Sequence, residues 1–190
     1  MSAVEAGENS GAGSGAKDGE AHQPNGRNEE LHTIAAKLIE TARKHSVSIG
    51  AAESCSGGMA ASALTSVPGC SDVFWGCVVS YANEAKVALL GVDEAVLSSV
   101  GAVDKNVALQ MASGACKALD VDFAFSTTGI AGPDGGSEHK PVGTVWVAVA
   151  GKGLQQATLY HFTGTREQIR QATAKQALHN LTDFIQISFG

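Results

Sequence analysis

Residues 47–66 read VSIGAAESCSGGMAASALTS, and this stretch carries the main fold signal of the chain. Its first part, Val47–Ala52, is a short run of residues that favours a β-strand. The Ala-rich segment Met59–Ser66 favours a helix, which ends before Pro68. The polar residues 53–58 therefore form a turn between a strand and a helix, which is the repeating unit of α/β proteins.

Outward from this unit, apolar periodicity and β-branched runs predict the other elements. The expected helices are about 29–44, 59–66, 83–90, 93–99, 104–119 and a last one from Thr165 through Ile185; the expected strands are 47–52, 73–81, 123–127, 142–150 and 155–162. Side chains that can cap helices precede four of them: Asn28, Asn83, Asp104 and Thr165.

The order of these elements predicts the fold class. Helices alternate with strands along the chain, which favours an α/β sandwich with helices on both faces of one sheet. The last two strands are neighbours, joined through residues 151–153, and this short connection predicts one antiparallel pair. The expected sheet is therefore mixed.

The first 28 residues differ in composition from the rest. They contain six of the 23 glycines and no Leu, Ile, Phe, Tyr or Trp, so they cannot bury a core. We expect residues 1–28 to be a disordered tail and residues 29–190 to form one folded domain.

Charge and hydropathy exclude several classes of protein. The net charge is −6 and no basic run is present, which argues against nucleic-acid binding through phosphate contacts. The sequence lacks a run of 18 apolar residues and a secretory signal, so we expect no membrane partner and a cytoplasmic location.

The cysteines and histidines give no metal-binding pattern. Cys55, Cys70, Cys77 and Cys116 form no C-x-x-C pair, and no histidine lies at zinc-ligand spacing from them. We expect reduced, mostly buried thiols and no metal site.

Polar segments follow the carboxyl ends of four predicted strands, where open α/β sheets bind their ligands. These segments are residues 53–58, 81–86, 127–136 and 163–166. In the first, Ser54 precedes a glycine pair at a helix start, which suits a nucleophile whose oxyanion is held by backbone N–H groups. The alternative is that Ser54 or Ser56 only caps the helix.

The other three segments offer further candidates, each with a structural alternative. Lys86 can act as a base for a serine when it is desolvated, with Tyr81 relaying or positioning the proton, or it can be a solvated lysine on a helix. The glycine-rich loop after Thr127 can surround a ligand with backbone, or be a surface turn. Arg166 can hold a phosphate, or be an exposed arginine in a first helical turn.

Together these segments resemble the CinA C-terminal domain family. The motifs that carry the resemblance are AESCSGG at 52–58, YANEAK at 81–86, GAV at 101–103, TGIAGPDGGSEHKPVGTV at 128–145 and GTR at 164–166. The resemblance covers about residues 30–187, and the longest motif is specific by its length alone.

The resemblance implies a fold and an activity. The implied fold is a three-layer α/β/α sandwich with a mixed, mostly parallel sheet. The implied activity is hydrolysis of the carboxamide of nicotinamide mononucleotide (NMN) to nicotinate mononucleotide and ammonia, which feeds NAD recycling. The partner is then a small nucleotide substrate, no metal or other cofactor is expected, and the chain is expected to form homo-oligomers, dimers or larger.

The resemblance also implies roles for residues. Ser54 is the expected nucleophile, and Lys86 takes its proton directly or through Tyr81, with backbone N–H groups near Gly57 holding the oxyanion. The residues expected to contact the substrate are Glu53, Ser56, Gly57, Thr128, Gly129 and Arg166.

Two positions depart from the family pattern. Ser56 stands where the family usually has threonine, and residues 73–77 lack an arginine that some members carry there. Longer members add an N-terminal hydrolase domain, which residues 1–28 cannot form, so we expect the stand-alone amidase form.

Two alternative functions remain open at this point. The chain can be a non-catalytic adaptor that binds competence or recombination proteins, or an amidase for another pyridine or purine nucleotide. An adaptor needs no combination of serine, tyrosine and lysine at strand ends, so the polar set favours the enzyme.

Overall fold

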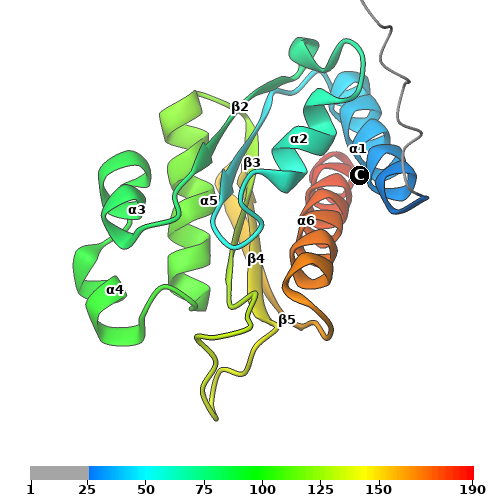
Figure 1. The fold of residues 1–190 in the computed structure, drawn as a ribbon. Coiled ribbons are helices and arrows are strands. Elements are labelled where there is room, and N and C mark those ends of the chain that lie inside the picture. Colours follow the sequence, from blue (N-terminus) through cyan, green and yellow to red (C-terminus); the bar gives the residue numbers. More distant parts are fainter. Residues whose placement is uncertain (1–25) are drawn as a thin grey trace, which may run out of the picture.

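The predicted strand–turn–helix unit is present in the structure, a computed structural model that describes residues 26–190. Strand β1 (Ile49–Glu53) leads through a turn into helix α2 (Met59–Thr65). All five residues of β1 are buried, as in a central strand that is covered on both faces. In the sheet, β1 lies between β2 and β3, and the turn follows the carboxyl end of this strand (Figure 1).

The other elements follow the predicted order. They are α1 (Gly26–His45), β2 (Phe74–Val79), α3 (Asn83–Leu90), α4 (Glu94–Val100), α5 (Lys105–Leu119), β3 (Phe123–Gly129), β4 (Thr144–Gly151), β5 (Leu154–His161) and α6 (Arg166–Phe189), with a short 3-10 helix at Cys70–Asp72. Of the expected tail, residues 1–25 lie outside the described residues. Residues 26–28 belong to α1, so the expected cap at Asn28 is wrong.

The sheet is mixed, as predicted, with the strand order β2-β1-β3-β4-β5. β1 pairs in parallel with β2 and β3, whereas β4 pairs antiparallel with both β3 and β5. The expectation of a single antiparallel pair was therefore incomplete. A parallel neighbour needs a long crossover, usually a helix, and the loop after β3 has none, so the chain returns directly beside β3.

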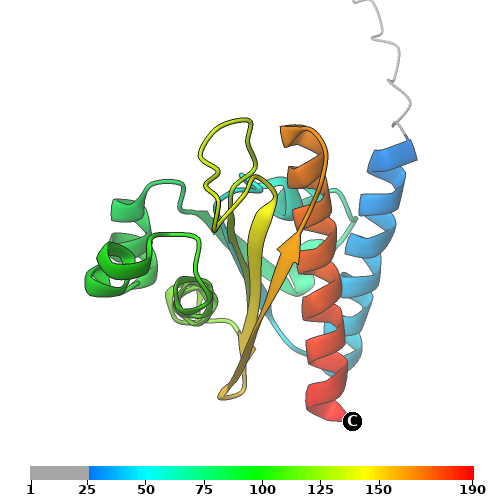
Figure 2. The ribbon, with the colours of Figure 1, turned by 90° about the horizontal axis from the view of Figure 1, so that it is seen from below.

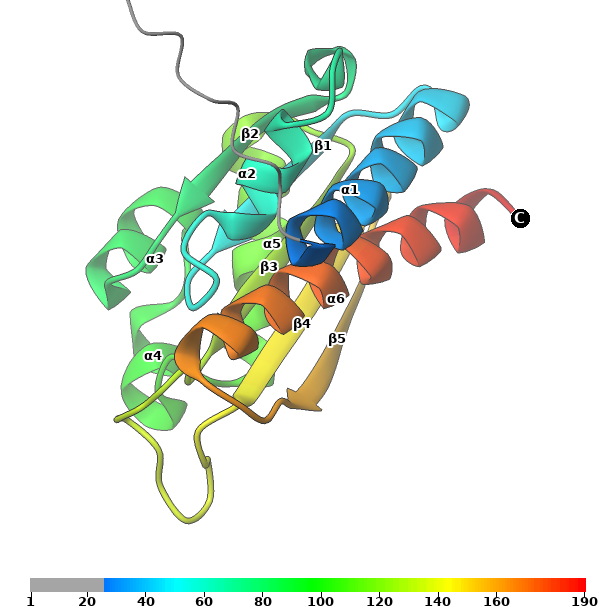
Figure 3. The ribbon, with the colours of Figure 1, turned by 45° about the vertical axis from the view of Figure 1, so that its right-hand side comes forward.

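Helices cover both faces of the sheet and make three layers (Figure 2). α1, α2 and α6 lie on one face, and α1 and α6 pack side by side there (Figure 3). α3, α4 and α5 lie on the other face. Each face has its own apolar core, with Phe123 and Phe125 of β3 buried in one and Val107 and Met111 of α5 buried in the other. No helix within residues 26–190 is long and apolar enough to cross a membrane.

The other three predicted helix caps can also be compared with the structure. Asp104 accepts a hydrogen bond from the Asn106 N–H, and Thr165 forms a capping box with Gln168, so both caps are confirmed. Asn83 is the first residue of α3 rather than its cap. The cap is Ala82, which has extended backbone angles and whose side chain offers no acceptor.

The sheet topology brings four chain segments together. β1, β2, β3 and β5 all end at the same edge, because β4 alone runs the other way. The loop between β3 and β4 and the start of α6 lie at this edge in Figure 1. The polar segments identified in the sequence are therefore neighbours in space.

Candidate active site

A pocket of about 260 Å³ lies at this edge of the sheet. Its lining comes from all four predicted segments and from the GAV motif: Ser54, Cys55, Tyr81, Lys86, Ala102, Val103, Thr128, Gly129, Ile130, Ala131, Gly132, Asp134, Gly135 and Arg166. Residues that are far apart in the chain thus share one pocket, and six of the nine predicted site residues line it.

Ser54 and Lys86 are in direct contact in this pocket. Ser54 is the first residue after β1, and its N–H donates to the Thr127 carbonyl at 3.0 Å, which fixes it against β3. Lys86 lies in α3, and its Nζ is 3.2 Å from the Ser54 Oγ. The same Nζ donates to the carbonyls of Ser80 at 2.8 Å and Tyr81 at 3.3 Å. The fold therefore places an amine beside a serine hydroxyl 32 residues away in sequence.

The Lys86 side chain is only 1% exposed. Burial lowers its pKa from the ordinary 10.5, and this effect outweighs the electrostatic influence of Cys55 and Glu84, which raises the pKa. Within residues 30–190 its ammonium forms no salt bridge, and its hydrogen-bond acceptors are a hydroxyl and two carbonyls. A lysine in this setting loses its proton more readily than an exposed one, and the neutral amine can accept a proton from a neighbouring hydroxyl.

The Tyr81 phenol takes a different position from the one a proton relay needs. Its hydroxyl accepts a hydrogen bond from Arg166 at 2.7 Å, and its side chain is 60% exposed. Arg166 also donates to the Gly132 carbonyl at 2.7 Å. Tyr81 contacts Lys86 through its backbone carbonyl, whereas its ring and Arg166 link two walls of the pocket.

Thr128 and Gly129 close the pocket at the end of β3. The Thr128 hydroxyl donates to the Ala102 carbonyl at 2.8 Å, which ties the GAV motif to the sheet. A Cβ on Gly129 would come within 2.8 Å of the Thr144 carbonyl, so only glycine fits there. Both residues line the pocket, and their predicted contact with the substrate stays a prediction.

Glu53, which is predicted to contact the substrate, does not line the pocket. It is 0% exposed, and its carboxylate accepts hydrogen bonds from the N–H groups of Gly58 at 2.9 Å and Ala61 at 2.8 Å. The acid therefore compensates the N-terminus of α2, where negative charge is favoured. Side chains along β1 alternate between the two faces of the sheet. Glu53 points to the face that α2 covers, and therefore away from the pocket.

Replacing Glu53 with glutamine should destabilise the fold. The amide keeps one acceptor oxygen but turns an NH₂ group toward backbone donors, so at least one buried N–H loses its partner. We expect the free energy of unfolding to fall by about 2 kcal/mol in urea titrations. Glu94→Gln is the control, because this exposed acid should change stability by less than about 0.5 kcal/mol. Equal stability of Glu53→Gln and wild type would contradict the role given to the carboxylate.

Ser56 and Gly57, which are also predicted to contact the substrate, likewise lie outside the pocket lining. Ser56 is buried, with its hydroxyl 2.7 Å from the Thr127 hydroxyl. The Gly57 N–H donates to the Ser54 carbonyl at 3.0 Å, so this group is not free to hold an oxyanion. By contrast, the N–H groups of Ala131 and Gly132 make no hydrogen bond within residues 30–190 and stay available to a ligand oxygen.

The sequence analysis missed the arginine that holds the Ser54 turn. Arg170, in α6, donates to the Ser56 carbonyl through Nε at 3.3 Å and through a terminal nitrogen at 3.0 Å. Its position four residues after Arg166 puts both arginines on one helix face, and this spacing was the available signal.

The cysteines are free, as predicted, but only Cys55 is fully buried, and the other three are half-buried. Cys55 lines the pocket next to Ser54. Burial raises the pKa of its thiol to about 12, so the thiol stays protonated and is a poor nucleophile at neutral pH. Ser54 is therefore the better-placed nucleophile of the two.

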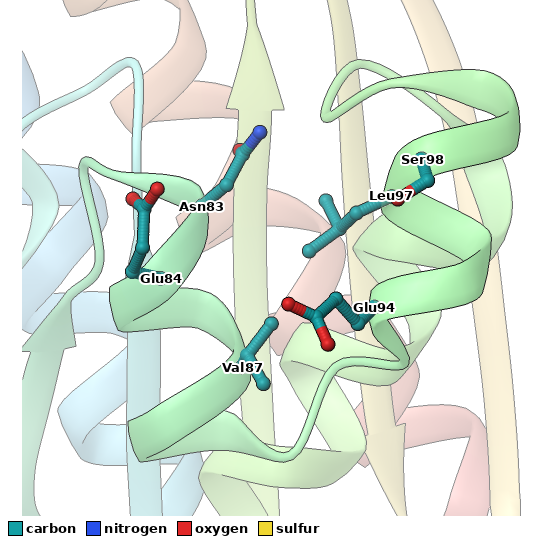
Figure 4. A pocket seen from close by; sticks show the side chains of 6 residues that line it. All are labelled: Asn83, Glu84, Val87, Glu94, Leu97 and Ser98. Atoms are coloured by element: carbon teal, nitrogen blue, oxygen red, sulfur yellow. The ribbon is translucent and has the colours of Figure 1, made fainter.

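A second hollow, of about 360 Å³, lies between α3 and α4 (Figure 4). Its two acids do not converge: Glu94 points toward Val87, whereas Glu84 points away from Glu94. Within the part of the chain that the structure describes, no three metal-ligating side chains gather at one point. This hollow holds no pair comparable to Ser54 and Lys86.

Comparison with known proteins gives consistent matches. Residues 31–185 match the family model of the CinA C-terminal domain. A CinA-like protein from Syntrophomonas wolfei is 47% identical over 148 residues, which are 78% of this chain and 35% of that protein. A CinA-like protein from Geobacter sulfurreducens is 46% identical over 147 residues, 77% of this chain and 36% of that protein. The chain thus spans about a third of the length of these curated relatives.

Solved structures match the fold. The crystal structure of a competence/damage inducible protein from Agrobacterium tumefaciens has a TM-score of 0.80 and 38% identity, covering 83% of this chain and 96% of that one. A competence-damaged protein (CinA) superfamily structure from Escherichia coli has a TM-score of 0.78 and 31% identity, covering 81% of this chain and 90% of that one.

Proposed function

This chain belongs to the CinA C-terminal domain family, and from that membership and the pocket geometry we propose that it is a nicotinamide-nucleotide amidase. The proposed reaction is hydrolysis of the NMN carboxamide to nicotinate mononucleotide and ammonia. The observation that carries the proposal is the contact of the buried Lys86 amine with the Ser54 hydroxyl at 3.2 Å. An adaptor surface has no use for a desolvated amine beside a hydroxyl.

The first half of the proposed mechanism is acyl transfer to Ser54. The neutral Lys86 amine takes the hydroxyl proton as the Ser54 Oγ attacks the amide carbon. The tetrahedral oxyanion needs N–H donors, and those of Ala131 and Gly132 are among the pocket-lining N–H groups that make no hydrogen bond within residues 30–190. Lys86 then returns the proton to the departing nitrogen, the C–N bond breaks, and ammonia leaves an ester on Ser54.

In the second half of the mechanism, water is the nucleophile and Ser54 is the leaving group. Lys86 takes a proton from a water molecule, and the resulting hydroxide attacks the ester carbon. The C–O bond to Ser54 breaks, its oxygen regains a proton from Lys86, and nicotinate mononucleotide leaves. The same amine thus serves both half-reactions, and no further cofactor enters the balance.

Arg166 is the residue we assign to the substrate phosphate. It lines the pocket, and two of its five N–H donors are engaged, one by Gly132 and one by Tyr81. A guanidinium fixed in this way can offer the remaining donors to a phosphate in bidentate geometry. Tyr81 then acts by holding Arg166 across the pocket.

Incubation of the purified chain with NMN tests the proposal. We expect ammonia in equal amount to nicotinate mononucleotide, identified by mass spectrometry, and slower hydrolysis of nicotinamide riboside, which lacks the phosphate. Hydrolysis of a different nucleotide carboxamide in a substrate panel would correct the substrate. Absence of ammonia from every nucleotide carboxamide, together with capture of a recombination protein, would replace the amidase by the adaptor.

A further inference from the structure

We propose that Arg170 is a positioning residue for the nucleophile: it holds the turn that carries Ser54 in its reactive geometry without touching the substrate. This inference rests on the proposed amidase function. It concerns a residue that lies outside the pocket lining and that the mechanism above does not use.

The contact of Arg170 with the turn is specific. Two of its nitrogens converge on one acceptor, the Ser56 carbonyl, at 3.0 and 3.3 Å. A Cβ on Gly57 would lie 3.3 Å from the same guanidinium, so glycine allows this close approach. Ser56 is therefore held from two sides. Its carbonyl accepts hydrogen bonds from Arg170 of α6, and its hydroxyl is hydrogen-bonded to the Thr127 hydroxyl of β3.

These contacts determine where Ser54 can lie. Ser54 stands between β1, which the sheet fixes, and the Ser56–Gly57 turn, which closes back on the Ser54 carbonyl through the Gly57 N–H at 3.0 Å. Without the Arg170 contact, the second end of this turn keeps the Ser56 hydroxyl on Thr127 and the Gly58 N–H on Glu53 but loses its anchor to α6. The Ser54 Oγ is then held less firmly at its distance from Lys86, which is fixed separately by α3 and the Ser80 carbonyl.

The other polar contact of Arg170 does not account for its placement. Arg170 pairs with Glu167 at 3.2 Å, but the glutamate is exposed, and such a surface pair stabilises little. The Arg170 side chain is 28% exposed, so it is partly desolvated where it packs against the turn. Because the Ser56 carbonyl is an acceptor within a turn, a bidentate arginine is well suited to restrain it.

The start of α6 links this contact to the substrate side of the pocket. The capping box of Thr165 and Gln168 fixes the first turn of the helix. Arg166 reaches the pocket from that turn, and Arg170 reaches the Ser56 carbonyl from the next one. One helix face therefore positions both the ligand-facing arginine and the nucleophile turn.

Arg43 provides a matched control at the opposite end of α2. Its guanidinium donates to the Gly69 and Pro68 carbonyls and pairs with Asp72 at 3.2 Å, so it restrains a turn with the same chemistry. That turn carries none of the pocket residues. Arg43→Met therefore removes an equivalent contact away from Ser54.

The experiment compares Arg170→Met, Arg170→Lys and Arg43→Met with the wild-type chain. For Arg170→Met we expect kcat for NMN to fall about 100-fold, with KM within about threefold, because small displacements of a reacting group are costly. The acid limb of the pH–rate profile should keep its pKa, since Lys86 is untouched. Arg170→Lys should recover about tenfold, because an ammonium can still donate to the Ser56 carbonyl. Arg43→Met should lower the melting temperature and leave kcat unchanged.

Hydrogen exchange gives a readout that does not depend on the substrate. In Arg170→Met the amides of residues 54–58 should exchange at least about tenfold faster, whereas Arg43→Met should accelerate only the exchange of residues near 69.

The proposed function fails alone if the wild type releases no ammonia from NMN while this exchange pattern holds. The positioning role is overturned if Arg170→Met keeps kcat within threefold, if its loss lies in KM, or if exchange of the turn is unchanged. Should Arg170→Met not fold, a wild-type kcat and exchange rate in Arg170→Lys would overturn it equally.

Discussion

Ser54→Ala is expected to lower ammonia release from NMN by at least about 10⁴-fold, since removal of a nucleophile eliminates the acyl-enzyme route. The fold should be unaffected, because the one hydrogen bond of the Ser54 Oγ within residues 30–190 is to Lys86. Lys86 keeps the carbonyls of Ser80 and Tyr81. Substrate binding should also persist, because Arg166 and the glycine-rich loop are unchanged.

The measurement is kcat from ammonia release, with NMN affinity by calorimetry and unfolding temperature recorded on the same samples. Ser62→Ala is the matched control, an exposed serine of the same strand–turn–helix unit, and it should keep wild-type kcat. If Ser54→Ala retained more than a tenth of the activity, a different group in the pocket would be the nucleophile. Cys55 is the nearest candidate, but the raised pKa of its thiol argues against it.

Lys86→Met is the second change with a large expected effect. Methionine is an unbranched side chain of similar length but cannot accept the Ser54 proton, so we expect kcat to fall by about 10³-fold or more. In the wild type, the rate should drop tenfold per pH unit below the pKa of Lys86, because only the neutral amine is a base. That pKa lies below 10.5 as a result of burial. The acid limb of the profile should disappear in the variant.

Lys105→Met serves as the control, because this exposed lysine at the start of α5 should leave both kcat and the acid limb unchanged. An acid limb that survives in Lys86→Met would assign the titration to another group. A Lys86→Met enzyme with wild-type kcat would remove the lysine from the mechanism entirely.

Lys86 should also make the free energy of unfolding depend on pH. In the unfolded chain Lys86 keeps its proton up to about pH 10.5, whereas burial makes the folded chain release it at lower pH. Between these two pKa values the unfolded chain binds more protons, so the wild type gains stability as pH rises, by up to about 1.4 kcal/mol per pH unit. Lys86→Met lacks this term. The difference in free energy of unfolding should therefore move in favour of the wild type from pH 7 to pH 10 in urea titrations.

Much of the fold follows from local sequence. The β1–α2 unit, the order of elements and the caps at Asp104 and Thr165 were predicted from short segments, because capping and periodicity depend on neighbouring residues. The second antiparallel pairing was not, since the direction in which β4 returns depends on how the long loop packs. The Asn83 cap failed for a similar reason, because the backbone angles of Ala82 decide where α3 begins.

For the site, the sequence by itself determined which residues are chemically able to act and which strand ends carry them. Ser54, Lys86 and Arg166 were identified in this way, since residue type and position after a strand are local properties, and Thr128 was identified through the family resemblance. The sequence did not distinguish a residue that lines the pocket from a buried residue next to it in the chain. Glu53 and Ser54 are adjacent, yet one serves the end of α2 and the other lies in the pocket.

The tertiary structure alone decided which groups meet. It brought the Lys86 amine to 3.2 Å from Ser54, turned the Tyr81 phenol toward Arg166, and placed Arg170 on the Ser56 carbonyl across 114 residues of chain. Such contacts depend on the relative placement of β1, α3 and α6, which packing on the two faces of the sheet fixes. Burial of the amine, which lowers its pKa, is likewise a property of that packing and of no single segment.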